Sequence, residues 1–514
     1  MEKLVLVDKK DRVLGYASKE ECHKGKGLLH RAFSIYVFDK RGRLLIQQRS
    51  EKKKLWPLFW SNTCCSHPRK GEDYIEAGER RLKEEMGFSC SLQMVDKFYY
   101  YASFKKVGSE KELCAILVGE YNGSKIKVNP KEVNDYKWVN VKTLFKDFKK
   151  NPQKYTPWFK MGLKLCVKAQ ERNKKLEKEF KNFSKNIAKK IYLKNKELLS
   201  LYVDKKFQKA VNYQNLTGGK RLRPILTVLS SKVLGGSEKD VLYPAAGLEI
   251  LHNCTLIIDD IIDHSSLRRQ KPTVWYKFGT SFAQCASMYF LGSAFLGANR
   301  TKNRKIVSEI FAKTIKTIMD GELYDILFEQ SGREDEPFVV KNRFSVISEK
   351  DYQKMISKKT AFLFSTCCEV GAICAGGNKR EITALKNYGF NLGMAFQIQD
   401  DILDIFGDEK TFGKKIGKDI EEKKIGNIVI FYTLKEISGK EKKSLLNIFK
   451  KGSIKEVDIK NALKIIKSTR SKELALKKAD KYLKKAKECL SLLPKNKYNH
   501  LLAFLTDFLA KRKI

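Results

Sequence analysis

Two acidic motifs set in apolar stretches constrain the fold of this 514-residue chain more than any other feature. Residues 256–269 read LIIDDIIDHSSLRR and carry Asp259, Asp260 and Asp263. Positions i and i+4 share one face of a helix, so Asp259 and Asp263 point the same way if this stretch is helical. Two carboxylates about 4 Å apart repel each other by roughly 4 kcal/mol at an effective dielectric constant near 20. A bound cation removes that repulsion, and Mg²⁺ typically joins a few carboxylates to substrate phosphates.

A second copy of this pattern lies at residues 396–410, FQIQDDILDIFGDEK, with Asp400, Asp401 and Asp404. One copy alone is equally well explained as the solvated acidic end of a helix. Two copies, each within an apolar helix, favour facing carboxylate clusters that hold several Mg²⁺ ions on one polyanionic substrate.

The composition predicts a multidomain globular protein with a strongly basic surface. The chain is long enough for two or three domains. Its net charge of +44 fits three kinds of partner, namely nucleic acid, an anionic membrane surface or anionic small molecules. Lysines are spread along the chain, and no zinc finger, RNA-recognition signature or aromatic-basic platform occurs. This distribution favours a solvated basic surface and argues against nucleic acid.

Targeting and cysteine patterns predict a cytoplasmic protein. The first residues, MEKLVLVDKKD, lack the basic and long apolar regions of a signal peptide. We interpret the apolar run at 281–298 as a buried core helix because it is short for a membrane span. The twelve cysteines form no CxxC pair, although two adjacent doublets occur, Cys64-Cys65 and Cys367-Cys368. Without a secretory signal, reduced thiols are expected.

Periodicity divides the chain into an N-terminal α/β domain and a C-terminal all-α domain. Residues 1–168 contain short β-rich stretches and one expected helix at 73–86, with Gly87 as its C-cap. Residues 169–184 predict a charged helical linker, and helical patterns dominate residues 185–514.

Histidines and carboxylates of the first domain predict a metal site. Cys65 and His67 are spaced by two, as are Glu110 and Glu112, so each pair shares one face of an extended segment. A single histidine is more readily explained as a structural or surface residue. Five side chains together suit Zn²⁺, Mn²⁺ or Mg²⁺: His23, His30, His67, Glu110 and Glu112.

The segment ending at Gly87 resembles a Nudix box. The matching residues are Glu72, Arg80, Leu82, Glu84, Glu85 and Gly87. Ser66 replaces a glycine of the box and Arg81 a glutamate, which weakens the interpretation as a nucleotide pyrophosphohydrolase. The stretches LLHRAFSIYVFD, WSNTCCSHP, RRLKEEMGF and EKEL resemble type I isopentenyl diphosphate isomerase over nearly all of the first 160 residues.

That resemblance implies a Nudix fold and the conversion of isopentenyl to dimethylallyl diphosphate. It implies an acid/base pair, Cys65 and Glu112, assisted by Tyr100. The five histidine and glutamate residues would hold the first metal, and Glu85 would help to hold a Mg²⁺ bound through the substrate diphosphate. Trp158 would stabilise a carbocation by cation–π contact. The implied diphosphate clamp comprises Lys19, Arg49, Lys53 and Arg81.

The second domain resembles the trans-isoprenyl diphosphate synthases, of geranylgeranyl diphosphate synthase type. GGKRLRP at 218–224, His252, the first aspartate motif, KKTAFLF at 358–364 and the second motif occur in the expected order. The resemblance implies an all-α bundle, a homodimer through this domain, and condensation of an allylic diphosphate with isopentenyl diphosphate.

The same resemblance assigns a role to each set of residues. The metal ligands are Asp259, Asp263 and Asp400, supported by Asp260, Asp401, Asp404 and Asp419. The groups expected on the allylic diphosphate are Arg268, Lys359 and Lys414, with Lys424 in a flanking loop. The groups expected on isopentenyl diphosphate are Lys220, Arg223, His252 and Arg269, and those beside the developing cation are Thr360 and Gln397. Glu322 stands where the family often has glutamine.

Product length is expected to depend on the residues before the first aspartate. In this family the positions four and five before it, here Thr255 and Cys254, form the floor under the growing chain. Cys254 is small, so the chain can pass it and Leu251, one turn further, becomes a candidate floor. A C20 product is expected, with C25 or longer as the alternative.

We therefore predict a bifunctional enzyme that uses Mg²⁺ in both domains, with Zn²⁺ or Mn²⁺ as alternatives in the first. Its substrates would be isopentenyl, dimethylallyl, geranyl and farnesyl diphosphates, and the product could bring it into peripheral contact with a membrane. One alternative is a Nudix hydrolase fused to a class I terpene cyclase, although cyclases usually replace the second DDxxD motif. Another is a basic non-enzymatic scaffold with degenerate sites, against which the intact acid and metal positions argue.

Overall fold

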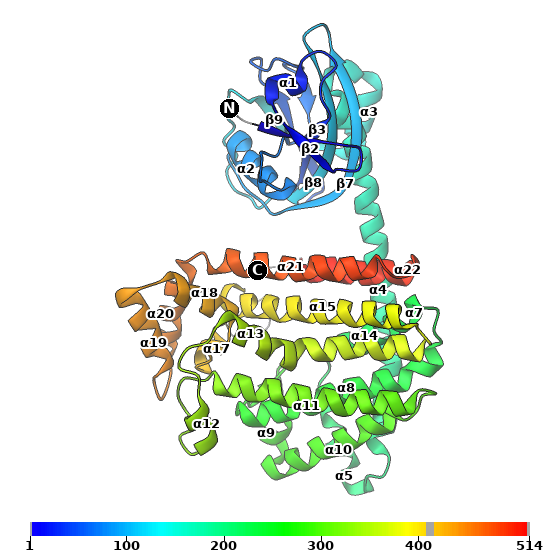
Figure 1. The fold of residues 1–514 in the computed structure, drawn as a ribbon, viewed down its shortest axis with the longest axis vertical. Coiled ribbons are helices and arrows are strands. Elements are labelled where there is room, and N and C mark those ends of the chain that lie inside the picture. The colour runs from blue at the N-terminus through cyan, green and yellow to red at the C-terminus, as the bar shows by residue number, and fades with distance from the viewer. Residues whose placement is uncertain (1–2, 408–415, 511–514) are drawn as a thin grey trace. The chain divides into compact units, whose positions relative to one another are not determined.

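The computed structural model describes residues 3–407 and 416–510 and divides the chain into two compact units, Met1–Lys175 and Leu176–Ile514 (Figure 1). The first is a β-sheet with covering helices and the second is helical, as predicted. The division falls inside the expected linker, within one continuous helix, α4 (Pro157–Ser200). Phe180 and Phe183 lie in that expected linker yet pack against the core of the second unit. The sparse apolar residues of the expected linker therefore belong to the core of the second unit.

The first unit is built on one mixed, nine-stranded sheet. Its strands are β1 (Lys3–Val7), β2 (Val13–Ser18), β3 (His30–Phe38), β4 (Arg43–Arg49), β5 (Trp60–Ser61), β6 (Cys64–Ser66), β7 (Leu92–Phe104), β8 (Gly108–Glu120) and β9 (Val133–Asn140). Its helices are α1 (Lys19–His23), α2 (Tyr74–Met86), α3 (Val141–Lys150), the 3₁₀ turn η1 (Pro152–Lys154) and the start of α4.

Strand register aligns several predicted site residues. Strands β3 and β8 run parallel with His30 opposite Glu112, and β7 places Tyr100 opposite Glu112 on the other side. Strand β6 pairs with β3 and sets Cys65 opposite Ser34. Since residues opposite each other share a face of the sheet, His30, Glu112 and Tyr100 form one row.

Helix α2 confirms the helix expected at 73–86. The Asp73 carboxylate accepts hydrogen bonds from the backbone N–H groups of Ile75 and Glu76, each at 2.8 Å, and so caps the first turn. Gly87 ends the helix in the left-handed region at φ 76°. A Cβ there would also clash with the Lys127 carbonyl, so both the backbone conformation and the lack of space require glycine.

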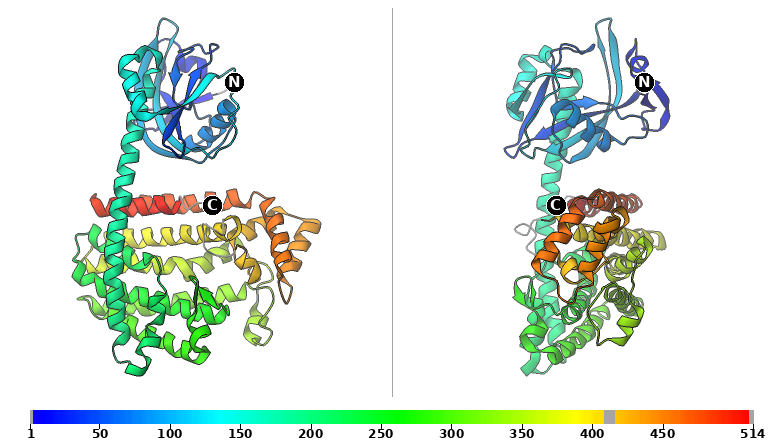
Figure 2. Two further views of the ribbon diagram at one scale, coloured as in Figure 1. Left: turned by 180° about the vertical axis from the view of Figure 1, so that it is seen from behind. Right: turned by 90° about the vertical axis from the view of Figure 1, so that its left-hand side faces the viewer.

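The second unit is a layered helical bundle in which α11, α14, α15 and α21 lie side by side (Figure 1), and the Leu176–Ser200 part of α4 crosses them (Figure 2). Its helices before the second acidic motif are α5 (Lys205–Val211), α6 (Tyr213–Leu216), α7 (Leu222–Val233), α8 (Glu238–Ile262), α9 (Val274–Phe278), α10 (Thr280–Ala298), α11 (Arg304–Leu327), α12 (Pro337–Asn342), α13 (Glu349–Ile356), the π-turn η2 (Ser357–Ala361) and α14 (Phe362–Cys374). The remaining elements are α15 (Lys379–Phe406), α17 (Lys418–Glu421), α18 (Ile428–Glu436), α19 (Gly439–Phe449), α20 (Glu456–Lys467), α21 (Ser471–Leu490), α22 (Lys497–Ala510) and a short hairpin of β10 (Leu267–Arg268) and β11 (Lys271–Pro272).

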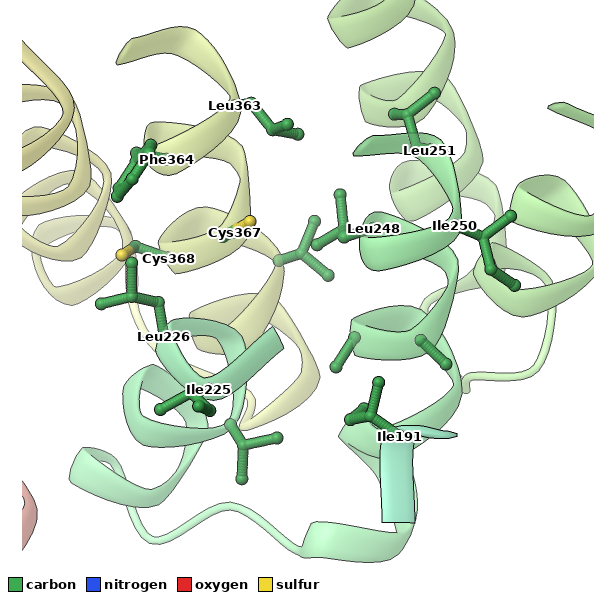
Figure 3. Packing of buried hydrophobic residues seen from close by; sticks show 14 of the residues in the cluster. Ile191, Ile225, Leu226, Leu248, Ile250, Leu251, Leu363, Phe364, Cys367 and Cys368 are labelled. Carbon is green, nitrogen blue, oxygen red and sulfur yellow. The ribbon is translucent and has the colours of Figure 1, made fainter. Parts of the chain in front are cut away.

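The core of this unit joins α4, α7, α8 and α14 (Figure 3). Helix α8 is, among the described residues, the one helix long and apolar enough to cross a membrane, but 78% of its apolar window is buried by the protein. That burial is typical of a core helix, and the last turn of α8 carries Asp259 and Asp260. Helix α10 covers the apolar run at 281–298 and packs on α8.

Helices α14 and α15 approach closely because α15 presents glycines to α14. A Cβ at Gly389 would clash with the Phe364 carbonyl, and one at Gly393 would lie 2.6 Å from the Ala361 Cα. These contacts fix the position of α15 against α14, and with it the position of the second acidic motif, which α15 carries.

Replacing Gly389 by leucine should therefore destabilise the helical unit, by about 2 kcal/mol for the overpacked contact. Differential scanning calorimetry of the full chain should show a lower unfolding midpoint for that unit. Gly292→Ala on α10, where a Cβ meets nothing within 4 Å, is the matched control and should leave that midpoint unchanged or slightly raised. Equal midpoints for both variants would contradict the close approach.

Candidate active sites

Five side chains in the first unit form a candidate metal centre. One ligand atom from each lies within 4.8 Å of all the others, the residues being His23, His30, His67, Glu110 and Glu112. Strands β3 and β8 position three of them in neighbouring rows. Helix α1, which begins with a Ser18–Glu21 capping box, ends at His23. The structure thus brings together the complete predicted cluster.

Hydrogen bonds orient the histidine rings towards the cluster. The Nδ1 atom of His23 lies 2.6 Å from the Lys19 carbonyl, and that of His30 lies 2.7 Å from the Leu28 carbonyl. Because a carbonyl only accepts, Nδ1 of each ring carries a proton and Nε2 faces the centre. The buried His30 Nε2 has no hydrogen-bond partner, and Glu110 Oε2 lies 2.8 Å from His23 Nε2. Acceptors that converge in this way fit a divalent cation.

An acid and a base lie beside this centre, on a wall of aromatic rings. The Tyr100 hydroxyl donates to Glu112 at 2.5 Å, and Trp158 Nε1–H donates to Cys65 Sγ at 3.2 Å. The Tyr100 and Trp158 rings lie 5.8 Å apart. Burial raises the pKa of Cys65, so the thiol keeps its proton at neutral pH. Burial alone would raise the pKa of Glu112 as well, but His30 outweighs it and keeps the carboxylate charged.

The predicted diphosphate clamp is held together by a residue that sequence reasoning missed. Glu132 forms ion pairs with both Lys53 and Arg81, and Arg81 also lies 2.5 Å from Glu85. Burial would raise the pKa of Glu132, but Lys53 and Arg81 outweigh it and lower the pKa to about 2. Glu132 lies in a loop without a sequence pattern of its own.

The other two clamp cations lie at the edges of the same site. The Arg49 guanidinium lies 5.5 Å above the Trp158 ring and donates to the Leu55 and Trp56 carbonyls. Lys19 begins α1. Burial first, and then neighbouring cations that include Lys19, lower the pKa of His67 well below its usual range.

In the second unit the two acidic motifs lie at the C-terminal ends of α8 and α15. Asp259 and Asp260 occupy the last turn of α8, with Asp263 as its C-cap, and Asp400 lies near the end of α15. Burial lowers the pKa of Arg223, and the charges of Asp400 and Asp259 both oppose that shift. Asp259 and Asp400 therefore both lie within electrostatic reach of Arg223, and that the two motifs face each other stays a prediction.

The expected supporting aspartates have protein partners of their own. Asp260 accepts from Arg268 at 2.8 Å, and burial still raises its pKa to about 6. Asp401 accepts from Tyr352 at 2.7 Å and from the Ile428 N–H at 3.0 Å. Asp404 accepts from the N–H groups of Lys418 and Asp419 at α17, at 3.0 and 3.2 Å, and Asp419 accepts from Asn427.

Two predicted substrate cations share a carboxylate that the sequence prediction omitted. Asp325 on α11 lies 2.6 Å from Lys359 Nζ and 3.1 Å from Lys424 Nζ, and Lys424 also lies 3.2 Å from Asp263. Lys359 belongs to the π-turn η2, a feature frequent at functional sites. Asp325 follows Glu322 by three residues, so both share one face of α11. This three-residue spacing from Glu322 is the feature of the sequence from which Asp325 could have been predicted.

Thr360 and Gln397 form a chain that leads to the second motif. The Thr360 hydroxyl donates to Gln397 Oε1 at 2.8 Å, and Gln397 Nε2–H donates to Asp401 at 2.9 Å. That these two residues lie beside the developing cation stays a prediction. Lys414, predicted on the allylic diphosphate, lies outside the described residues.

The predicted isopentenyl diphosphate residues gather around the loop before α7. Arg223 donates to His252 Nε2 at 2.8 Å, and Arg269 donates to the Gly218 carbonyl, next to Lys220. Burial and then Arg223 lower the pKa of His252 well below its usual range, so the ring is neutral and accepts. Arg221, another omitted residue, forms a buried 2.6 Å ion pair with Glu249. Arg221 has a φ of 49°, so the backbone of the loop before α7 is locally strained, and Arg269 has a φ of 53° in the turn between β10 and β11.

The chain-length residues lie along α8. Cys254 is buried and its thiol donates to the Ser287 carbonyl of α10 at 3.2 Å, while the Thr255 hydroxyl donates to the His252 carbonyl. Leu251 is buried one turn before Cys254 and points into the core region shown in Figure 3.

Family models match both units of the chain. The polyprenyl synthetase model matches residues 204–466, and the NUDIX domain model matches residues 28–159.

Individual proteins resemble one unit each. An isopentenyl-diphosphate Delta-isomerase of Serratia proteamaculans is 45% identical over 158 residues, which cover 31% of this chain and 87% of that protein. A short chain isoprenyl diphosphate synthase of Methanocaldococcus jannaschii is 37% identical over 282 residues, or 54% of this chain and 80% of that protein. A polyprenyl synthase structure from Caulobacter crescentus, complexed with calcium and isoprenyl diphosphate, has a TM-score of 0.57 and 27% identity and covers 66% of this chain and 98% of its own.

Removing the divalent ion should destabilise the first unit, because the convergent carboxylates and imidazoles would then be left without a counter-charge. Chelator-treated protein should unfold at a lower temperature in calorimetry, and added Zn²⁺, Mn²⁺ or Mg²⁺ should restore the midpoint. Glu110→Gln should weaken binding of the most effective ion by about tenfold or more, measured by isothermal titration. Glu79→Gln on α2, whose carboxylate accepts from the Leu92 N–H outside the cluster, should bind the ion normally. Equal affinities for the two variants would contradict a metal centre at the cluster.

Proposed function

The chain belongs to the polyprenyl synthetase family and, over its first unit, to the isopentenyl-diphosphate isomerases of NUDIX fold, and we propose that it is one enzyme with two consecutive activities. The first unit isomerises isopentenyl diphosphate to dimethylallyl diphosphate. The second condenses allylic diphosphates with isopentenyl diphosphate. The observation that carries the proposal is that a buried thiol and a buried carboxylate lie on one aromatic wall in one unit, while in the other Asp263 of the first acidic motif and Asp325 share the predicted substrate cation Lys424.

In the isomerase unit, Cys65 and Glu112 exchange protons with the substrate. Cys65 holds a proton that it can give to the alkene, and Glu112, kept ionised by Tyr100 and His30, can accept one from the allylic carbon. The aromatic wall excludes water and presents π faces to a developing positive charge. The diphosphate would lie on Arg49, Lys53 and Arg81, with the metal neutralising its charge.

In the synthase unit, cationic side chains and metal-binding carboxylates share the work on the diphosphates. Asp259, Asp263 and Asp400 would hold Mg²⁺, which assists departure of diphosphate from the allylic substrate. Lys359, Lys424 and Arg268 would bind that diphosphate. The second substrate would lie on Arg223, Arg269 and Lys220, with neutral His252 as a hydrogen-bond partner.

Isopentenyl diphosphate supplied alone with Mg²⁺ should give prenyl diphosphate products of several isoprene units, since the first unit provides the allylic primer. Cys65→Ala should lower this synthesis by about 100-fold or more, because general acid catalysis contributes about that much. Added dimethylallyl diphosphate should restore it. Asp259→Ala should abolish it even with the primer present. Products are measured by chromatography of the radiolabelled diphosphates.

Two results would reject this assignment. One is an unprimed Cys65→Ala chain with wild-type activity. The other is a wild-type chain that makes no product from dimethylallyl and isopentenyl diphosphates together. Cyclised hydrocarbons from geranylgeranyl diphosphate alone would instead support a terpene cyclase.

We further propose that the product is geranylgeranyl diphosphate, a C20 chain. Cys254 is small and lies on the α8 face that meets α10, so it would let a C15 chain pass. Leu251 lies one turn further and would stop the chain near C20. The proposed homodimer through the helical unit, the peripheral membrane contact and the cytoplasmic location stay predictions.

Phenylalanine at position 254 should shorten the product from C20 towards C15, because its ring would occupy the path of the growing chain. Reverse-phase chromatography of the dephosphorylated products measures the shift. Cys285→Phe, at an exposed position of α10, is the matched control and should keep the wild-type product. An unchanged product from Cys254→Phe would place the floor elsewhere.

A further inference from the structure

Glu322 is a buried carboxylate whose second oxygen has no partner. Its side chain is 4% exposed, and Oε2 lies 2.8 Å from Lys359 Nζ. The other oxygen, Oε1, is buried without a hydrogen bond. A carboxylate oxygen that is buried and unpaired costs free energy unless a cation or donor reaches it.

Local packing places Glu322 beside the metal-binding region. The preceding residue, Gly321, lets α11 approach the π-turn so closely that a Cβ would clash with the Lys359 backbone. Burial raises the pKa of Asp259, and the charge of Glu322 is the next largest contribution to that rise. Glu322 and Asp325 both contact the predicted diphosphate cation Lys359, and Asp325 shares Lys424 with the predicted metal ligand Asp263. Glu322 therefore belongs to the same network of ion pairs as one predicted metal ligand.

We propose that Glu322 is a positioning residue that couples metal binding to diphosphate binding in the synthase unit. This inference rests on the proposed prenyl transfer. Together with Asp325, Glu322 holds the Lys359 ammonium against α11 and neutralises it. Its unpaired oxygen adds negative potential near Asp259, which strengthens the binding of a divalent cation there. Its neutralisation of Lys359 weakens the binding of a diphosphate that carries no metal.

The proposal predicts changes of opposite sign when the charge is removed. In Glu322→Gln the side chain keeps its shape, so a purely structural role should alter neither ligand selectively. The charge role requires weaker Mg²⁺ binding, by about tenfold, because an anion near the ion is lost. It also requires tighter binding of metal-free inorganic pyrophosphate, by about threefold or more, because Lys359 is no longer neutralised.

Isothermal titration of the full chain measures both affinities, with Mg²⁺ in one series and inorganic pyrophosphate with chelator in the other. The same titrations of Asp259→Ala, which keeps the N-terminal site, provide the Mg²⁺ background to be subtracted. Glu369→Gln is the matched control, since Glu369 forms a comparable 2.7 Å ion pair with Lys386 on α14 and α15. It should leave both affinities at the wild-type values. Glu322→Asp, which keeps the charge, should restore most of the Mg²⁺ affinity.

Opposite shifts in Glu322→Gln support the coupling. Unchanged affinities, or equal weakening of both ligands with a lowered unfolding midpoint, would overturn it. Either of those results in a chain that still makes prenyl diphosphates rejects this inference and leaves the proposed function intact. Failure of the wild-type chain to make product rejects the proposed function itself.

Discussion

Pairing of buried charge is the constraint on which both units depend. A charged group removed from water is stable only when a partner of opposite charge or several hydrogen bonds reach it. In the first unit Glu132 lies between Lys53 and Arg81, and in the second Asp325 lies between Lys359 and Lys424. Each carboxylate keeps two cations close together before any diphosphate arrives. A substrate phosphate then meets cations that are already in position.

The catalytic groups in the two units differ in how their protonation is controlled. Cys65 keeps its proton because burial disfavours the thiolate, whereas Glu112 stays charged because His30 and Tyr100 supply compensating contacts. Two neighbouring groups thus receive opposite protonation states from their surroundings, which is what a proton transfer between two carbons requires. In the synthase unit the predicted site consists mainly of carboxylates and cations, and its work falls to charge neutralisation.

Most of this arrangement could be predicted from residues with short, characteristic spacings. The i, i+4 aspartates, the helix capped by Asp73 and Gly87, and the alternating Glu110 and Glu112 depend on local periodicity, which a sequence displays directly. Glu132 and the Arg221–Glu249 pair could not be found in that way, because their partners are distant in the chain and only the folded backbone brings them together. The start of the second unit was also hard to predict, since Phe180 looks like part of a charged linker until its packing partner, Phe504, is known.

The π-turn at Ser357–Ala361 makes the site depend on the number of residues in this segment of the protein, and not only on which residues they are. A π-turn holds one residue more than the α-helical turn it replaces, so it is equivalent to a single-residue insertion. Deleting that residue would convert the turn to regular α-helix and rotate Lys359 by roughly 100° about the helix axis, since an α-helix has 3.6 residues per turn. The ammonium would leave Asp325 although every side chain of the site was still encoded. A comparison of homologous sequences that counts matches and ignores one-residue gaps at this turn would therefore overlook the change that separates an active site from an inactive one.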